Sequence, residues 1–314
     1  MVDSTYRRRL AIQVAELWQG EPASLLHVSD SENYVYSFTA FEKKYFLRLT
    51  PSHHRSLRQI EAELDFVDYL HLGGVSASLP LPSASQRMIE QVQIGSDSFF
   101  ACAFEEAEGE RFTFGSSEAN KKHFQLRGQT LGRIHALAKR YAPSISSRRF
   151  AWDEDDCILN AERYLPRSEE VVWTEYQQLM NWSRDYPKDE QSFGLIHGDF
   201  GATNLRCKAD RLTVFDFDDC CYHWFAYDLA VVIYPHGWRE EARALLDSLL
   251  DGYSEETSGN FNSTADLTNF CRLRLLYMFL TYAKKWGFAD LSDEQAKWFA
   301  RKRENMVRGY RLDV

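Results

Sequence analysis

The sequence lacks the features that mark a membrane protein, a secreted protein or a zinc-thiolate protein. None of the six cysteines forms a Cys-x-x-Cys pair, so we expect no zinc site of that spacing. No apolar run approaches the ~18 residues that a membrane-spanning helix requires. The stretch from Met1 to Gly20 is polar and charged, so we expect no signal peptide. These absences predict a cytoplasmic protein with reduced, buried thiols and no membrane partner.

Basic residues are in the minority, because 37 Lys and Arg stand against 46 Asp and Glu, a net charge of −9. A nucleic-acid-binding surface normally carries a basic stripe, so we expect no nucleic-acid partner. The short basic stretches at 7–9 and 301–303 lie among helix formers and are interpreted as solvated helix faces. A net negative charge suits a cationic or amino-bearing small molecule. The oligomeric state stays open.

The first third of the chain is rich in strand patterns. Its 314 residues suffice for two domains that share a cleft. Apolar spacing and alternation predict helices at 6–18 and 56–72, strands within 25–49 around a turn at 42–44, and strands near 87–93 and 98–104. The acidic segment 105–110, with Gly109, is typical of a hinge.

The rest of the chain is mainly helical, apart from a strand-rich interruption at 193–217. Helices are predicted at 117–140, 154–164, 169–186, 225–234, 240–253, 267–286 and 292–310. We therefore predict an α+β fold with a small β-rich N-terminal lobe at 1–104, a hinge at 105–110 and a larger helical C-terminal lobe at 111–314. Ligands commonly bind where two such domains meet.

Two segments carry the polar residues that phosphoryl transfer requires. Asp199 ends an apolar run, Asn204 comes five positions later, and Asp216 ends a second apolar run at 212–215. Transfer from ATP needs a carboxylate that orients the attacking hydroxyl and oxygen ligands for magnesium ions that bridge the phosphates. Asp199 is placed for the first role, whereas Asn204 and Asp216 offer the ligand types that Mg²⁺ prefers.

The order of these residues resembles the protein-kinase pattern, in which Asp-x-x-x-x-Asn precedes a metal-binding Asp-Phe-Gly. Here the tripeptide is Asp216-Phe217-Asp218, and the lead residues are His197-Gly198-Asp199. The stretch more closely resembles the aminoglycoside phosphotransferase and choline kinase group of small-molecule kinases. The signature of that group is His-Gly-Asp-x-x-x-x-Asn, then Ile-Asp-Phe/Trp and a downstream Asp-Leu-Ala. Tyr227-Asp228-Leu229-Ala230 and the segment 131–137 also match, so the resemblance covers roughly residues 25–290.

The resemblance implies a protein-kinase-like bilobal fold and an enzyme that uses ATP and Mg²⁺ to phosphorylate a small-molecule hydroxyl. It implies that Asp228 braces the catalytic loop through hydrogen bonds and that His197 packs that loop, with a role for His197 as general base left open. Asp218 and Asp219 are each interpreted either as a further metal ligand or as part of a solvated turn.

The resemblance places the nucleotide site in the first domain. The strand that usually carries a phosphate-binding lysine offers Arg48 instead, with Lys43 and Lys44 in the expected turn ranked lower. The helix carboxylate that pairs with it would be Glu63, or otherwise Glu61. The glycine-rich loop is missing, so Ser31 and Asn33 are the candidates for phosphate contact through their loop. Adenine would be bound by the backbone at 103–105, through Phe104 and Glu105.

The acceptor hydroxyl has to reach Asp199 and the γ-phosphate together. Aromatic rings suit an amine or a quaternary ammonium group, and the candidates for the pocket wall are Tyr222, His223, Trp224, Tyr277, Tyr282 and Trp286. The acceptor stays open among an aminoglycoside, choline, homoserine, a sugar and a protein Ser or Thr. Two other hypotheses remain: a nucleotide-binding pseudokinase, motivated by Arg48 and the missing glycine loop, and a non-catalytic helical interaction protein.

Overall fold

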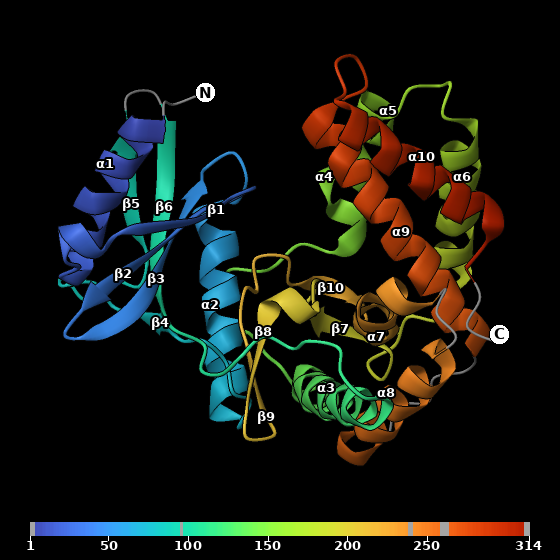
Figure 1. Ribbon diagram of the computed structural model, residues 1–314, viewed down its shortest axis with the longest axis horizontal. Helices are drawn as coiled ribbons and strands as arrows, with labels where there is room; N and C mark the ends of the chain where they lie inside the picture. The colour runs from blue at the N-terminus through green and yellow to red at the C-terminus, as the bar shows by residue number, and fades with distance from the viewer. Residues whose placement is uncertain (1–3, 95–96, 238–240, 258–263, 311–314) are drawn as a thin grey trace. The chain divides into compact units, whose positions relative to one another are not determined.

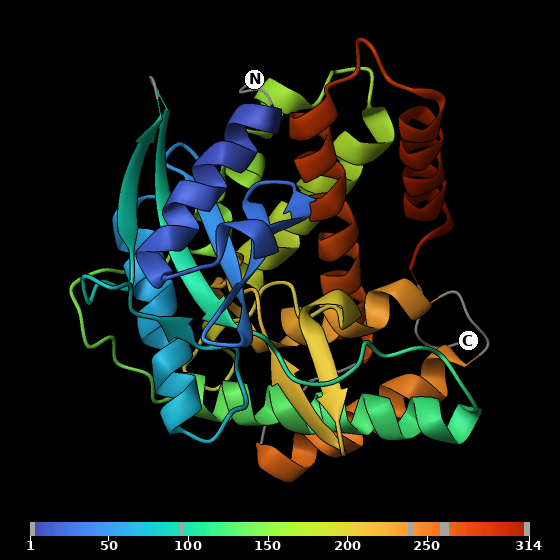
Figure 2. The ribbon, with the colours of Figure 1, turned by 60° about the vertical axis from the view of Figure 1, so that its left-hand side comes forward.

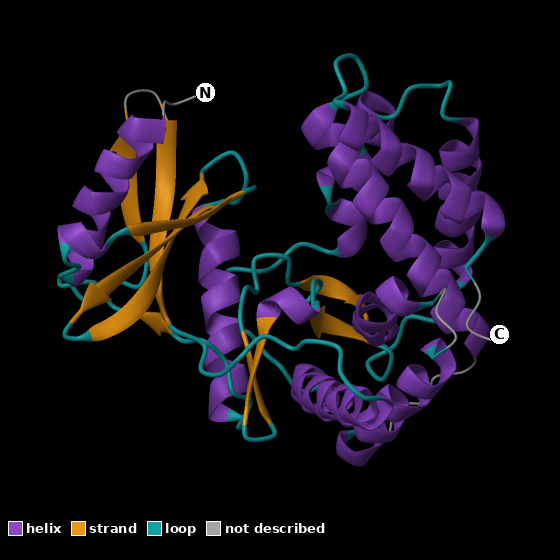
Figure 3. Ribbon diagram, viewed as in Figure 1, coloured by secondary structure: helices purple, strands orange, loops and turns teal. Residues whose placement is uncertain are grey.

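The structure is a computed structural model that describes residues 4–94, 97–237, 241–257 and 264–310. The chain forms two compact units, the first made of 1–110, 142–149 and 206–218, and the second of 111–141, 150–205 and 219–314. Strands dominate the first unit and helices the second, as Figure 1 and Figure 3 show. The small β-rich part and the larger helical part are those that the sequence predicts.

A six-stranded antiparallel sheet forms the centre of the first unit. Its order is β1-β2-β3-β6-β4, and β5 pairs with β6 outside that path. The strands are β1 (Leu26–Asp30), β2 (Tyr34–Ala40), β3 (Lys43–Pro51), β4 (Pro80–Leu81), β5 (Glu90–Ile94) and β6 (Asp97–Glu105). The helical segments are α1 (Ser4–Ala15), η1 (Glu16–Trp18), η2 (Pro22–Ser24) and α2 (Leu57–Leu72).

The two helices α1 and α2 cover opposite faces of this sheet, as Figure 2 shows. Successive strand residues point to opposite faces, so Ala101 and Ala103 of β6 pack in the cluster of α1, whereas Cys102 packs with Ile60 and Leu64 of α2. The same alternation in β3 buries Leu47 and Leu49 in the α1 cluster. Arg48, between them, is therefore directed toward α2.

The predicted turn at 42–44 is displaced by one residue. Ala40 pairs with Lys43, which leaves Phe41 and Glu42 as a two-residue loop with φ values of 51° and 61°. A two-residue hairpin loop of this kind needs positive φ at both positions, so that its twist matches that of the strands. The prediction was wrong because it followed polarity, whereas backbone geometry decides which residues form the turn.

Two short segments from the later sequence belong to the first unit. β8 (Leu205–Lys208) and β9 (Arg211–Val214) form a hairpin, and the Ser78 N–H donates to the Val214 carbonyl at 2.9 Å. The other segment is 142–149, in which the Ser147 hydroxyl donates to the Glu61 carboxylate at 2.8 Å. Both segments lie within the range 111–314 that we assigned to the C-terminal lobe.

Helices make up most of the second unit, joined by one short two-stranded ribbon of β7 and β10. The helices are α3 (Ser117–Ala138), α4 (Asp156–Leu159), α5 (Ala161–Tyr164), α6 (Glu170–Asp185), α7 (Phe225–Ile233), α8 (Ala242–Glu256), α9 (Thr264–Trp286) and α10 (Asp293–Arg308). The ribbon strands are β7 (Phe193–Ile196) and β10 (Cys221–Trp224), and the 3₁₀ turns are η3 (Trp152–Glu154), η4 (Ala202–Asn204) and η5 (Tyr234–His236).

Two predictions for the second unit were wrong. The helix predicted at 154–164 is broken at Asn160, whose ψ of 36° leaves the helical region, so that two short helices replace one. The sequence also gave no sign of β10, since its pairing partner β7 lies 25 or more positions earlier in register, as in Cys221 opposite Ile196. Among the described residues, no helix is both long and apolar enough to cross a membrane.

Candidate functional site

The catalytic loop begins where β7 ends and carries Asp199 at its third position. Gly198 has a φ of +83°, and a Cβ atom there would lie 2.2 Å from the Asp219 carbonyl oxygen, so this position accepts only glycine. The turn directs Asp199 outward, and its side chain is 30% exposed. A carboxylate that stays this accessible can meet a reacting group, which the buried Asp228 cannot.

Asp228 of α7 holds the backbone of this loop. It is fully buried, and its two carboxylate oxygens accept the N–H groups of His197 and Gly198, each at 2.9 Å. Burial alone would raise the pKa of Asp228. A hydrogen bond from His135 at 3.2 Å, the electrostatic influence of His135 and His197, and the N–H group of His197 together lower this pKa below its usual value. The Tyr253 hydroxyl lies 2.9 Å from the other ring nitrogen of His135. The carboxylate thus stays ionised and fixes the loop.

The Asp199 carboxylate contacts two side chains within the second unit. Its Oδ2 accepts the Asn204 side-chain amide at 3.0 Å, and its Oδ1 accepts a hydrogen bond from the Arg274 guanidinium. The Asn204 nitrogen also donates to the Asp199 carbonyl at 3.0 Å. These bonds use the amide nitrogen of Asn204, so its oxygen is directed away from Asp199 and can serve a metal ion.

Asp216 follows β9 in the first unit and is exposed. Its φ of 65° lies in the left-handed region, which costs a non-glycine residue about 1 kcal/mol. Strained backbone of this kind gathers at functional sites. An exposed carboxylate is a ligand type that fits Mg²⁺, which takes few protein ligands and fills its other positions with phosphate oxygens and water.

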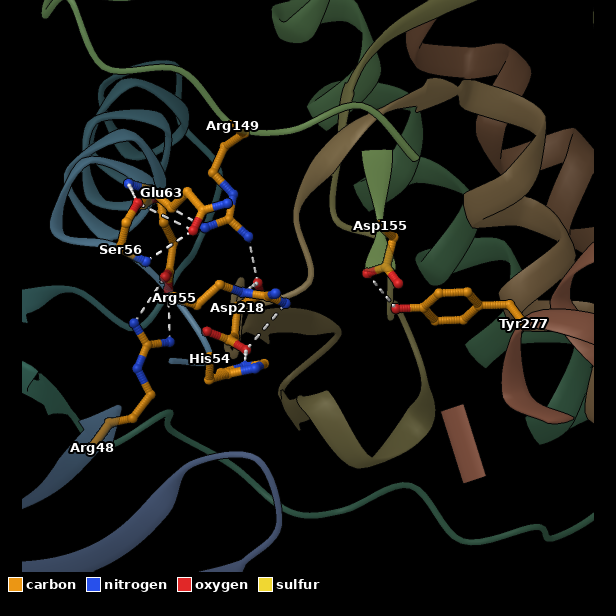
Figure 4. Close-up of polar contacts among 10 residues, drawn as sticks. Arg48, His54, Arg55, Ser56, Glu63, Arg149, Asp155, Asp218 and Tyr277 are labelled. Carbon is orange, nitrogen blue, oxygen red and sulfur yellow. Dashed lines mark hydrogen bonds and ion pairs between the residues drawn. The ribbon is translucent and has the colours of Figure 1, made fainter. Parts of the chain in front are cut away.

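Asp218, two residues on, is almost fully buried among cations (Figure 4). His54 lies 2.7 Å and Arg55 3.5 Å from its Oδ2, and Arg149 donates to its carbonyl oxygen. Burial alone would raise the pKa of Asp218, but Arg55, His54 and Arg48 hold it well below its usual range. Glu32, His54 and Asp218 bring ligand atoms within 4.8 Å of one another. The cations beside Asp218 disfavour a divalent ion, so the arrangement favours an anchoring role.

Arg48 and Glu63 form a buried ion pair in the first unit. Two parallel hydrogen bonds of 2.7 and 2.8 Å join the guanidinium to the carboxylate, with side chains 6% and 1% exposed (Figure 4). Of the two predicted partners, Glu63 therefore pairs with Arg48, while Glu61 accepts from Ser147. The pair joins β3 to α2 as the lysine–glutamate pair of protein kinases does. Lys44, by contrast, is paired with Glu106.

The residues predicted to contact adenine and the phosphates also lie in the first unit. Some of their backbone groups already form hydrogen bonds within the protein. Glu105 donates its N–H to the Leu79 carbonyl at 2.9 Å and accepts from Ser78, so an adenine contact through Glu105 would have to share these groups. Phe104 is paired with Pro80 of β4, and because proline has no N–H group, Pro80 cannot donate a backbone hydrogen bond to Phe104. Ser31 is exposed, whereas Asn33 is buried and turns its side chain inward.

A small cavity of about 30 Å³ adjoins the catalytic loop within the second unit. Gly198, Asp219 and His223 line it, together with Tyr227 of α7 and Tyr277 of α9. Asp155 adds a second carboxylate, which accepts from the Tyr277 hydroxyl at 3.3 Å (Figure 4). A space of this size holds about one water molecule. It can therefore receive one small group of an acceptor, such as an ammonium group.

The remaining predicted acceptor residues do not line this cavity. Trp224 is buried and packs with Trp182 and Phe270, and Tyr222 donates its N–H to the Phe150 carbonyl at 2.9 Å. The rings of Tyr282 and Trp286 pack against each other near the C-terminal end of α9, with their centroids 4.4 Å apart. These two residues lie four positions apart on a helix, and a core aromatic cluster has the same sequence pattern as a pocket wall.

Sequence reasoning missed the cationic residues that hold the site. Arg127 of α3 is buried and donates to the Phe200 carbonyl at 2.8 Å, and Arg274 of α9 contacts Asp199. Arg55 and Arg149 hold the Asp218 backbone. One signal was available, because an arginine between leucines in α9, such as Arg274, has to be paired if it is buried.

Comparison with known proteins shows the family of this chain. The profile of a family described as "Phosphotransferase enzyme family" matches residues 25–263. Amicoumacin kinase of Bacillus subtilis (strain 168) is 28% identical over 298 residues, which cover 91% of this chain and 85% of that protein. The structure of "Amicoumacin kinase hAmiN in complex with AMP-PNP, Ca2+ and Ami" superposes with a TM-score of 0.88 at 26% identity, over 98% of this chain and 96% of that one.

More distant structures share the fold. A microcompartment-associated aminopropanol kinase matches with a TM-score of 0.80 at 22% identity, over 97% of this chain and 99% of that one. A thermostable mutant of the aminoglycoside phosphotransferase APH(4)-Ia matches with a TM-score of 0.64 at 15% identity, over 95% of this chain and 98% of that one. The predicted protein-kinase-like α+β fold is confirmed. The chain belongs to the phosphotransferase enzyme family and is an ATP-dependent phosphotransferase.

Proposed function

We propose that this protein uses ATP and Mg²⁺ to phosphorylate a hydroxyl group of a small, amine-bearing molecule. The observation that carries the proposal is the exposed Asp199 carboxylate on a loop whose backbone is fixed by the buried Asp228. In the transfer, the acceptor oxygen forms a bond to the γ-phosphorus while the bond from that phosphorus to the bridging oxygen of ADP breaks. Asp199 orients the hydroxyl and takes its proton.

Asn204 and Asp216 would hold the metal, which, when bound, offsets the charge of the phosphates. Arg48 would bind the phosphates of the nucleotide, since the two donors it gives to Glu63 leave its Nε without a partner. The loop residues Ser31 and Asn33 and the backbone at Phe104 and Glu105 stay predictions for the remainder of the nucleotide.

The cavity beside the loop supports an acceptor that carries an amine. Two carboxylates, Asp155 and Asp219, and the rings of His223, Tyr227 and Tyr277 line it. A buried ammonium is stabilised by carboxylates and by aromatic faces. The name of one protein with this fold, an aminopropanol kinase, is in line with an acceptor of this class.

The test is a screen of amino alcohols, aminoglycosides, choline, homoserine, sugars and a generic protein substrate, with phosphorylated product detected by mass spectrometry. We expect transfer to an amine-bearing alcohol that stops when EDTA removes the metal. Asp199→Ala should lower kcat by at least about 100-fold and retain the melting shift that AMP-PNP with Mg²⁺ produces. The control is Asp247→Ala, at an exposed position of α8, which should match the wild type.

Three results would contradict the proposal. Full turnover by Asp199→Ala would remove Asp199 from the reaction. A nucleotide-dependent melting shift with no product from any acceptor would favour the pseudokinase hypothesis, and the absence of any shift would favour the interaction-protein hypothesis. The intact Arg48–Glu63 pair makes the pseudokinase the weaker candidate.

A further inference from the structure

Arg274 is a largely buried cation that lies between leucines in α9. Its neighbours Leu273, Leu275 and Leu276 are each at most 1% exposed, and the Arg274 side chain is 14% exposed. Burying a charged side chain costs several kcal/mol unless partners compensate it. A charge retained at such a position therefore has to be accounted for by what it contacts.

Arg274 contacts the catalytic loop directly. The guanidinium donates to Oδ1 of Asp199, and Tyr227 interacts with it electrostatically. Tyr227 precedes Asp228 on α7, the residue that fixes the backbone at His197 and Gly198. One helix thus holds the backbone of the loop through Asp228 and, through Tyr227 and Arg274, its reactive side chain.

Two donors, one on each oxygen, fix the orientation of the Asp199 carboxylate. Asn204 donates to Oδ2 at 3.0 Å, and Arg274 donates to Oδ1. A carboxylate offers about four lone-pair sites, so these two bonds leave room for the hydroxyl of an acceptor. The cavity lined by Leu273, Tyr277 and Tyr227 lies next to this carboxylate, since Gly198 also lines it.

We propose that Arg274 is a positioning residue that orients the Asp199 carboxylate toward the acceptor hydroxyl. The inference rests on the phosphotransfer proposed above. Phosphoryl transfer through a loose transition state depends more on placement of the nucleophile than on its full deprotonation. Arg274 supplies that placement without touching ATP, so its loss lowers kcat and leaves nucleotide binding unchanged.

The experiment compares Arg274→Met with Arg274→Lys, which have similar length and differ in charge. The acceptor is the one found in the screen above, and kcat, the KM for ATP and the AMP-PNP melting shift are measured for each variant. We expect Arg274→Met to lower kcat about 10- to 100-fold with both nucleotide readouts unchanged. Arg274→Lys should recover part of that loss, and Tyr227→Phe should lower kcat about threefold to tenfold.

Arg272→Met is the matched control, because Arg272 lies on the same helix and forms an ion pair with Glu175 at 2.8 Å, away from the loop. It should change stability without changing kcat. A kcat for Arg274→Met within twofold of the wild type would overturn the inference, as would an equal loss in Arg272→Met or in Arg274→Lys. A wild type that phosphorylates nothing would instead refute the proposed function, and the inference with it.

Discussion

Replacing Asp228 by asparagine tests whether this buried carboxylate holds the catalytic loop. In the wild type its two oxygens accept two backbone N–H groups, and His135 lies 3.2 Å from one of them. Asparagine has nearly the same shape, but its NH₂ group cannot accept a hydrogen bond. One of the backbone donors, at His197 or Gly198, then faces another donor in a fully buried position.

The magnitude follows from this count. One buried donor left without an acceptor costs about 1–3 kcal/mol, and each remaining bond changes from a charge-assisted to a neutral one, at about 1 kcal/mol. Neutralising a buried charge recovers part of that cost. We expect the free energy of unfolding to fall by about 2–4 kcal/mol. We also expect kcat to fall, because the backbone that directs Asp199 is displaced.

Urea unfolding followed by tryptophan fluorescence measures the change, since Trp152, Trp182 and Trp224 all lie in the second unit. The control is Asp247→Asn, because Asp247 is 51% exposed and pairs with Arg243 along α8. Such a pair contributes about 0.5 kcal/mol or less. A loss in Asp228→Asn no larger than that of the control would refute the idea that these hydrogen bonds hold the loop.

Two further predictions concern buried charge. Glu63→Ala leaves the Arg48 guanidinium without its partner and should lower the stability of the first unit by about 3–5 kcal/mol. The double variant Arg48→Met with Glu63→Leu should recover stability but lose AMP-PNP binding. Melting curves recorded with and without nucleotide test both expectations. Burial, with Arg127 nearby, lowers the pKa of His123 to about 3, so only the unfolded chain takes up this proton as the pH falls below about 6.5. The free energy of unfolding should therefore fall as the pH is lowered. His123→Phe should reduce the slope of this free energy against pH by about 1.4 kcal/mol per pH unit between pH 6 and 4. An unchanged slope in urea titrations would contradict this.

Local signals in the sequence predicted the elements that depend on neighbouring residues. Ser56 and Gln59 form the capping box that starts α2, and apolar residues at helical spacing bury one side of that helix. The residues Asp199 and Asn204 are five positions apart, so a single turn of the chain brings them into contact. A contiguous motif of this kind predicts its own geometry.

Predictions from residue type alone were less reliable. Tyr282, Trp286 and Trp224 were expected in the acceptor pocket and pack with other rings instead. The sequence does not distinguish a ring that faces a ligand from one that faces the core, because both lie on an apolar face of a helix or strand. Asp218 likewise looked equally suited to a metal site and to a turn, until His54 and Arg55 were found beside it.

By itself the sequence determined the strand and helix pattern, the catalytic loop and the reaction class that this loop implies. Only the tertiary structure decided which charges hold that loop. Arg274 reaches Asp199 across 75 positions, and Arg149 reaches Asp218 across 69. The physical reason is that hydrogen bonds and ion pairs depend on distance in space. A sequence records that distance only where the partners lie within a few residues, on one turn or one pair of adjacent strands.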